Sequence, residues 1–217
     1  MAAHLIAAVK AGDAAAIEAL LASDPELAGA EEDGIPAVRI ALYHRQPAAL
    51  EALLAAQPPL DGLDHAALGW ADDLRRDVAG DPDLVARRSA DGFTALHYAC
   101  FFGGAAATAV LLEAGADADA QAENDTRVRP LHSAAAAHDA ACVRLLLEGG
   151  ADPDARQAGG YTPLLAAAHR DDEEIAALLL RHGADPSLRN DDGADAEGIA
   201  RANGAVAVLA LLGAPTG

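Results

Sequence analysis

The chain has 217 residues, with 34 acidic and 15 basic side chains and a formal net charge of −19. This acid excess argues against DNA, RNA or an anionic membrane surface as the partner, because each of these requires a basic protein surface. No apolar stretch reaches the ~18–20 residues of a membrane span, and the first ten residues lack the cationic segment and cleavage site of a signal peptide. Only 3% of the residues are aromatic, so alanine and leucine must fill the core.

The first part of the chain repeats weakly. A leucine pair at 20–21 recurs 33 residues later at 53–54. The connection that follows, 57–62, is too short for the full loop that joins the later units. Gly69 is predicted to end the next helix, and Trp70 to begin the turn after it.

The middle of the chain repeats strongly. A Gly-Ala-Asp triplet begins at Gly115, Gly150 and Gly183, with steps of 35 and 33 residues. A Thr-Pro-Leu-His-like segment and a leucine run recur with the same two steps. Three markers with one period predict a single domain, 1–217, built from stacked repeats. The approximate units are 1–30, 31–60, 61–88, 89–123, 124–156, 157–189 and 190–217.

Each unit has a physical interpretation. Asp-Gly supplies a turn, the threonine hydroxyl can cap the first helix, and proline fits its first turn. A second, leucine-bearing helix ends at the glycine of Gly-Ala-Asp. One buried leucine contributes only ~1.5–3 kcal/mol, so a lone helix pair cannot offset its ordering entropy, whereas stacked pairs share a core.

The segments Asp91-Gly-Phe-Thr-Ala-Leu-His-Tyr-Ala-Cys100 and Val110-Leu-Leu-Glu-Ala-Gly-Ala-Asp117 resemble the ankyrin repeat. Three clear copies cover 89–189, and both flanks are degenerate. The resemblance implies an all-α solenoid of about seven L-shaped helix–turn–helix units with finger loops and degenerate terminal capping repeats. It also implies a concave side that usually binds a protein, and no cofactor. One lysine against fourteen arginines is typical of GC-rich bacterial coding sequences.

Two loops depart from the pattern beside the short connection at 57–62. The finger from Asp117 to Arg129 is two residues longer than the next one and lacks the usual Asp-Gly. The last unit has polar residues, 193–198, where the Thr-Pro-Leu-His segment would stand. Polar substitution of this kind is typical of a capping repeat.

In ankyrin repeats the residue after the turn glycine, and the two that precede the end of the inner helix, face the concave groove. The fourth unit would place all three phenylalanines of the chain there, while the fifth would leave a shallow step. Exposed aromatic residues are typical interface anchors; alternatively, they cover the alanines of neighbouring units. The expected groove residues are Ile35, Tyr43 and His44; Phe93, Phe101 and Phe102; Val128, Ala136 and Ala137; and Tyr161, His169 and Arg170.

Other chemistry-bearing residues have structural interpretations. The resemblance implies that His97 and His132 hydrogen-bond the backbone between neighbouring fingers. Cys100 and Cys142 form no metal or disulfide pattern, which predicts buried thiols in a reducing cytoplasm. The acidic run 171–174 is expected at the start of an outer helix, where carboxylates complement the dipole. No metal-ligand spacing and no nucleophile motif occurs.

The leading hypothesis is therefore a non-catalytic, monomeric, cytoplasmic scaffold that binds another protein through its groove and fingers. The acid excess either keeps an alanine-rich surface soluble or steers a basic partner. The expected acidic rim comprises Asp33, Asp91, Asp125 and Asp191.

Two alternatives remain at this stage. In the first, Trp70, Tyr43 and the long finger close a small-molecule or enzymatic pocket, with His44 or His65 as its acid–base group. In the second, the chain has a structural or self-associating role.

Overall fold

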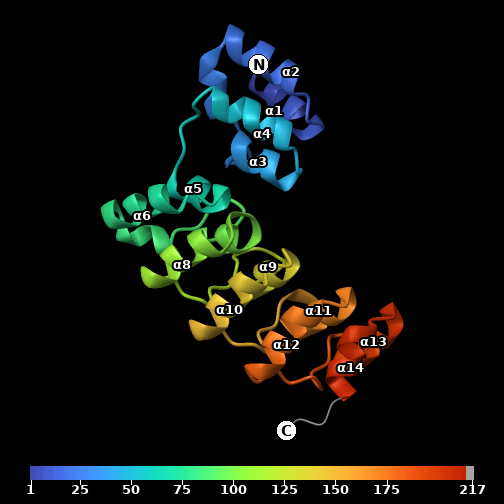
Figure 1. Cartoon of the computed structure of the whole chain (residues 1–217). Helices are drawn as coiled ribbons and strands as arrows, with labels where there is room; N and C mark the ends of the chain where they lie inside the picture. Colours follow the sequence, from blue (N-terminus) through green and yellow to red (C-terminus); the bar gives the residue numbers. More distant parts are fainter. Residues whose placement is uncertain (214–217) are drawn as a thin grey trace.

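The computed structural model describes residues 1–213 and consists of helix pairs stacked in a curved row (Figure 1). Each of the seven predicted unit ranges contains one pair, although 214–217 of the last range lie outside the described residues. The all-α solenoid is confirmed. The inner helices are α1 (Ala2–Ala11), α3 (Ala37–Tyr43), α5 (Gly62–Leu68), α7 (Ala95–Tyr98), α9 (Pro130–Ala136), α11 (Pro163–Arg170) and α13 (Ala196–Asn203). The outer helices are α2 (Ala14–Ser23), α4 (Pro47–Ala55), α6 (Ala71–Gly80), α8 (Ala105–Glu113), α10 (Ala140–Glu148), α12 (Glu173–Arg181) and α14 (Val206–Gly213).

Short elements fill the connections between units. They are the 3₁₀ turns η1 (Pro25–Gly29), η2 (Pro82–Val85) and η4 (Ala158–Gly160), the π-helical turn η3 (Ala99–Gly103), and the strands β1 (Glu31–Glu32) and β2 (Ile35–Pro36). The two strands pair antiparallel and form the first finger. Among the described residues, every helix is too short or too polar to cross a membrane.

Helix caps follow from the residues that the sequence places at the turns. Asp139 accepts a hydrogen bond from the backbone N–H of Cys142 at 2.9 Å, and Asp172 accepts one from Ile175 at 3.1 Å. Thr162 caps α11 through the N–H of Leu165. Each bond satisfies an N–H that the first helical turn leaves unpaired. After α10, Gly150 adopts a φ of 90°, which its lack of a Cβ allows.

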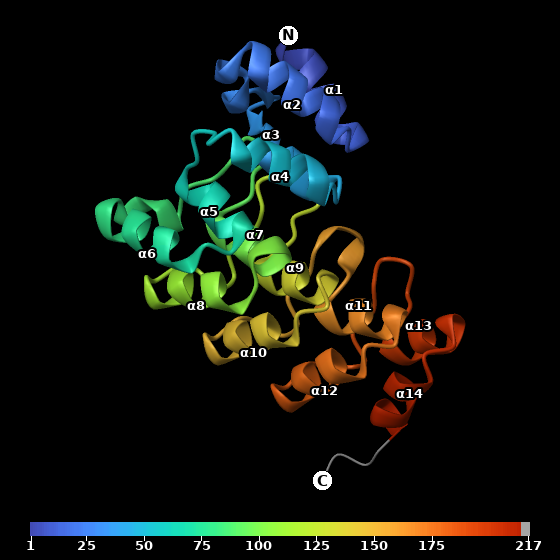
Figure 2. The same ribbon diagram turned by 45° about the horizontal axis from the view of Figure 1, so that its top comes forward.

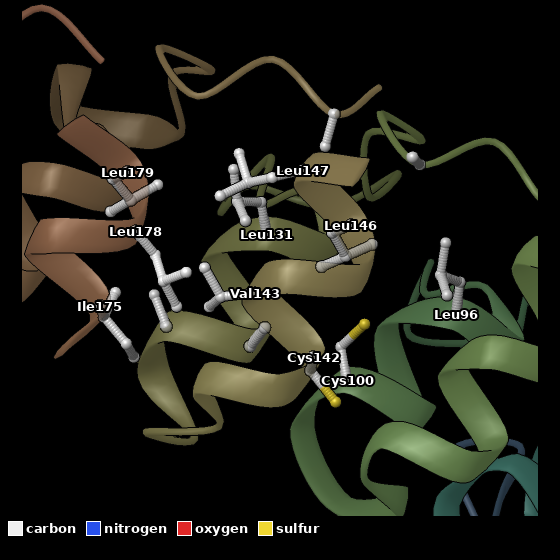
Figure 3. Close-up of a cluster of buried hydrophobic side chains, with 14 of the residues drawn as sticks. Leu96, Cys100, Leu131, Cys142, Val143, Leu146, Leu147, Ile175, Leu178 and Leu179 are labelled. Carbon is white, nitrogen blue, oxygen red and sulfur yellow. The ribbon is translucent and has the colours of Figure 1, made fainter. Parts of the chain in front are cut away.

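The core of the solenoid is built from leucine and alanine, as the composition predicts. Leu131, Leu146 and Leu179 are fully buried between successive helix pairs (Figure 3). Inner helices pack on inner helices, and outer on outer, along the stack. The small alanine side chains let these helices approach closely, so each unit is stabilised mainly by its neighbours.

Buried apolar residues fall into two separate clusters, divided at the connection between α4 and α5. One cluster lies in the first two units, from Leu5 to Leu53, and the other runs from Leu63 to Val208. The extended connection joins the first two units to the rest in both views (Figures 1 and 2). A single domain therefore remains a prediction, and polar residues bridge its two cores.

The inner helix of the fourth unit ends in a π turn, which the sequence did not predict. The N–H of Gly104 bonds to the carbonyl of Ala99 at 2.8 Å, five residues back. In the preceding unit α5 ends at Gly69, as predicted, and this leaves room for the π turn. A Cβ on Gly103 would lie 2.0 Å from the carbonyl oxygen of Ala66, so only glycine fits this contact.

Candidate functional site: an aromatic pocket in the groove

A cavity of about 210 Å³ opens on the face formed by the inner helices and the fingers. It lies between the fourth and fifth units, at the shallow step that the sequence predicts. Most of its wall is apolar. The lining residues are Tyr43, Phe93, His97, Tyr98, Phe101, Phe102, Thr126, Val128, His132, Ser133, Ala136 and Gln157.

The aromatic wall is an edge-to-face cluster. The rings of Phe101 and Phe102 lie 4.7 Å apart at 84°, and Phe102 meets Tyr43 at 5.3 Å and 81°. Phe93 packs on Tyr98 at 6.1 Å. Such arrangements are the favourable ones for aromatic quadrupoles. The π turn that carries Phe101 and Phe102 widens the helix at this point, a feature often found at functional sites.

Tyr43 belongs to the second unit, yet it contacts the fourth. Because the third unit lacks a full finger, the finger of the second unit lies directly against that of the fourth. A Cβ on Gly34 would lie only 2.8 Å from the Cβ of Ala90. The short connection therefore brings Tyr43 to Phe102 across one intervening unit.

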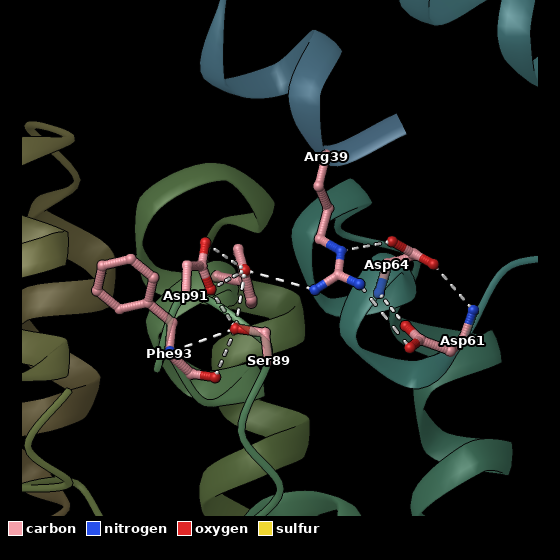
Figure 4. A network of polar contacts seen from close by, with 7 residues as sticks. Arg39, Asp61, Asp64, Ser89, Asp91 and Phe93 are labelled. Carbon is pink, nitrogen blue, oxygen red and sulfur yellow. Dashed lines mark hydrogen bonds and ion pairs between the residues drawn. The ribbon is translucent and has the colours of Figure 1, made fainter. Parts of the chain in front are cut away.

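A polar network holds this contact in place (Figure 4). Asp91 accepts hydrogen bonds from the hydroxyls of Tyr43 at 2.6 Å, Tyr98 at 2.7 Å and Ser89. Burial alone would raise the pKa of Asp91, but the bonds from Ser89, Tyr43 and Tyr98 lower it below its ordinary value. Asp91 was expected on an open acidic rim. It is half-buried, and its carboxylate is committed to the pocket wall.

A buried ion pair continues the network toward the third unit. The guanidinium of Arg39, in α3, lies 2.8 Å from the carboxylate of Asp64, in α5, and both residues are buried. Arg39 also donates to the hydroxyl of Tyr98 and stacks over its ring at 5.3 Å. Burial raises the pKa of Asp64 to about 6, and Arg39 opposes this rise. These contacts bridge the two apolar clusters.

Two histidines at the base of the pocket serve the architecture, and their predicted hydrogen bonds to neighbouring fingers are confirmed. The Nε2 of His97 contacts the carbonyl of Val128 at 3.1 Å, and that of His132 contacts Tyr161 at 3.2 Å. Each Nδ1 accepts the N–H that begins its own helix. Burial lowers the pKa of both imidazoles to about 4. Both rings are therefore neutral at pH 7 with both nitrogens engaged.

The remaining predicted groove residues lie around the pocket rather than in it. Ile35 and His44 line a separate open depression beside Tyr43. Tyr161 is half-buried, and His169 is exposed in the sixth unit. Arg170 reaches back to the fifth unit, where it donates to the carbonyl of Ala136 at 2.9 Å. The predicted rim residues Asp33, Asp125 and Asp191 are exposed.

Trp70, which would help to close the pocket in the small-molecule alternative, does not line it. It lies in another open depression and stacks on His65 at 5.8 Å. His65 in turn contacts Asp77 at 2.5 Å, outside the aromatic pocket. The sequence alone did not predict the pair of His65 and Asp77, because twelve residues and a turn separate them.

The cysteines and acidic residues behave largely as predicted. Cys100 and Cys142 are buried free thiols, and Thr108 lies between them, 3.7 and 3.3 Å from their sulfurs. Burial raises the pKa of the Cys100 thiol well above its usual value. Of the acidic run 171–174, Asp172 caps the outer helix α12 and the two glutamates lie in its first turn, as predicted, whereas Asp171 ends α11. Among residues 1–213, no group of three His, Cys, Asp or Glu side chains has the arrangement of a metal site.

The repeated fold and its finger hydrogen bonds agree with the comparison to protein families. Residues 5–157 and 118–190 match ankyrin repeats, in the form of a three-copy family. The chain belongs to the ankyrin-repeat family. Ankyrin repeats are generally scaffolds for protein–protein interaction. No curated protein is similar enough to this ankyrin-repeat protein to count as a relative.

Besides His97, Tyr98 and His132, three lining residues were not predicted as groove residues: Thr126, Ser133 and Gln157. For Ser133 the repeat itself carried a signal. Ser133 stands 35 residues after Tyr98, so a large side chain in one unit is replaced by a small one in the next. Comparing the inner-helix positions that follow the capping segment would have located the hollow.

Proposed function

We propose that this ankyrin-repeat protein is a non-catalytic scaffold whose aromatic pocket and surrounding groove bind a partner protein. The observation that carries the proposal is the pocket itself. Five aromatic side chains line an open cavity in a chain with few aromatic residues and an alanine–leucine core: Tyr43, Phe93, Tyr98, Phe101 and Phe102. Desolvated aromatic pockets are where interface binding energy concentrates.

Charge favours a partner with a basic surface. The chain has a formal net charge of −19, and the exposed carboxylates of Asp33, Asp125 and Asp191 lie on its fingers. Such a surface attracts cationic proteins and repels nucleic acid and anionic membranes. We further propose that the protein acts as a monomer in the cytoplasm.

The alternative of a small-molecule site is supported by the same cavity, whose volume suits a single ring system. An enzymatic role has less support at this site. His97 and His132 are neutral and fully engaged, while His65 lies elsewhere with Asp77. Binding without chemistry is the common element of both candidates.

The test compares three immobilised proteins in capture from a cell lysate: wild type, Ala136→Trp and Trp70→Ala. Ala136 lines the pocket, so the indole fills it. Trp70→Ala is the control, because it removes an aromatic side chain that lies outside the pocket and is as exposed as Tyr43 in the pocket wall, at 40%. We expect a captured protein to be lost with Ala136→Trp and retained with Trp70→Ala.

Calorimetry with the purified partner then gives affinities. Loss of an anchor contact costs ~2 kcal/mol or more, so Ala136→Trp should weaken binding at least about tenfold. Circular dichroism checks that all three proteins remain folded. If the partner binds wild type and Ala136→Trp with equal affinity, the pocket is not the binding site.

A further inference from the structure

The pocket exists because the fifth unit carries small residues where the fourth carries aromatic ones. Ser133, Ala136 and Ala137 each stand 35 residues after Tyr98, Phe101 and Phe102, respectively. In the fourth unit the large side chains fill the groove, whereas in the fifth the corresponding space is empty. The hollow therefore has the place, within the repeat, of a tyrosine ring.

Polar side chains also line the hollow. Ser133, which is 8% exposed, and Gln157 both belong to its lining. A hydroxyl both donates and accepts hydrogen bonds, so an occupant that carries one can pair with these side chains when it displaces water from them.

The fourth unit shows what chemistry such a space accepts. The ring of Tyr98 is 2% exposed, and its hydroxyl bonds to Ser89 at 3.1 Å and to Asp91 at 2.7 Å. The backbone N–H of Ser89 bonds to the carbonyl of Phe93 in the finger of the fourth unit, and the N–H of Ala122 bonds to the carbonyl of Val128 in that of the fifth. Thr126 of that finger also lines the pocket. A phenol in the hollow would thus meet apolar walls and polar side chains.

Size is consistent with one aromatic side chain. A closed apolar cavity of roughly 150 Å³ holds benzene, and the pocket has about 210 Å³ with an open mouth. A phenol fits this space better than a leucine, which would leave the walls incompletely contacted. The edge-to-face wall of Phe93, Phe101 and Phe102 offers the geometry that a further ring prefers.

We infer that the pocket receives a tyrosine side chain of the partner protein, with its hydroxyl at Ser133 and Gln157. This inference rests on the proposed protein-binding function and specifies its anchor. The acidic fingers around the groove favour basic residues next to that tyrosine. Phenylalanine would fill the same walls but leave the Ser133 hydroxyl unpaired, so the pocket discriminates by one hydroxyl.

The test uses 4-methylphenol, which reproduces the tyrosine side chain, and toluene, which reproduces phenylalanine. Nuclear magnetic resonance titration of the full chain measures both affinities and identifies the residues whose signals shift. We expect 4-methylphenol to bind at least about threefold more tightly than toluene, with shifts at Phe101, Phe102 and Ser133. Ser133→Ala should remove this preference without weakening toluene binding. Ala136→Trp should abolish binding of both probes.

Three results would overturn the inference: equal affinities for the two probes, an equal loss of both in Ser133→Ala, or no shift at the pocket residues with either probe. These results leave the proposed function separately testable. If Ala136→Trp still loses the captured partner, the groove binds a protein through some other anchor. If a partner is identified, replacing its contact tyrosine by phenylalanine should weaken wild type but not Ser133→Ala.

Discussion

Replacing His132 by leucine should make the stability of the protein depend less on pH. The fold itself supplies a leucine at this position of the next unit, Leu165, 33 residues on and fully buried. The side chain is therefore compatible with the inner helix. The variant loses the contact from Nε2 to the carbonyl of Tyr161, at 3.2 Å, and the acceptor for the N–H of Arg129.

The magnitude follows from the pKa of His132, which burial lowers from 6.5 to about 4. Because the pKa is lower in the folded state, the unfolded chain binds the proton first as the pH falls. Stability is therefore lost as pH falls from about 6.5 toward 4. Between pH 7 and pH 5 this single imidazole should reduce the free energy of unfolding by roughly 2 kcal/mol. Leucine cannot titrate.

The assay is urea unfolding followed by circular dichroism, for both proteins at pH 7 and at pH 5. At pH 7 the variant should be less stable by about 1–3 kcal/mol, because a backbone carbonyl loses its partner. At pH 5 the difference should shrink by roughly 2 kcal/mol. Other titrating groups, such as Asp64 and Asp91, are present in both proteins and largely cancel from this comparison.

His97→Leu provides an independent repetition, since His97 has the same contacts one unit earlier and a pKa of about 4. The double variant should show about twice the change. If the gap between wild type and His132→Leu is the same at both pH values, within about 0.5 kcal/mol, the neutral buried imidazole is not the source of the pH dependence.

Three further predictions concern packing, each measured by urea unfolding at pH 7. Gly103→Ala should lower the free energy of unfolding by about 1–3 kcal/mol, because the new Cβ would lie 2.0 Å from a carbonyl oxygen. Gly80→Ala is the control and should leave the stability unchanged, because no atom lies within 4 Å of its Cβ. Asp64→Ala should cost about 3–5 kcal/mol by leaving Arg39 buried and uncompensated, and Arg39→Met combined with Asp64→Leu should cost less. A double variant as unstable as Asp64→Ala would contradict this. Leu146→Ala should cost about 2–5 kcal/mol, since Leu146 is fully buried; a loss under 1 kcal/mol would contradict the packing.

The position of the aromatic residues shows where sequence reasoning worked and where it stopped. The repeat assigned Phe93, Phe101 and Phe102 to the groove, and all three line the pocket. It also assigned Asp91 to an open acidic rim. The structure instead commits Asp91 to two tyrosines. One of these, Tyr43, lies 48 residues away, a contact that no local pattern encodes.

The sequence by itself determined the repeat, because a period of about 33 residues requires each helix pair to pack like the one before it. It also determined the helix caps, which depend on residues three apart. The leucine core and, through the resemblance to ankyrin repeats, the interfinger bonds of His97 and His132 were predictable because they depend on residues about one unit apart.

Only the tertiary structure decided what happens where the repeat is irregular. The short connection at 57–62 brings the second unit against the fourth, and the π turn at 99–103 displaces two phenylalanines. These effects depend on how whole units settle against one another. The small residues of the fifth unit predicted a shallow step in the groove. The step becomes a walled pocket because Tyr43, two units before the fourth, reaches across and packs on Phe102.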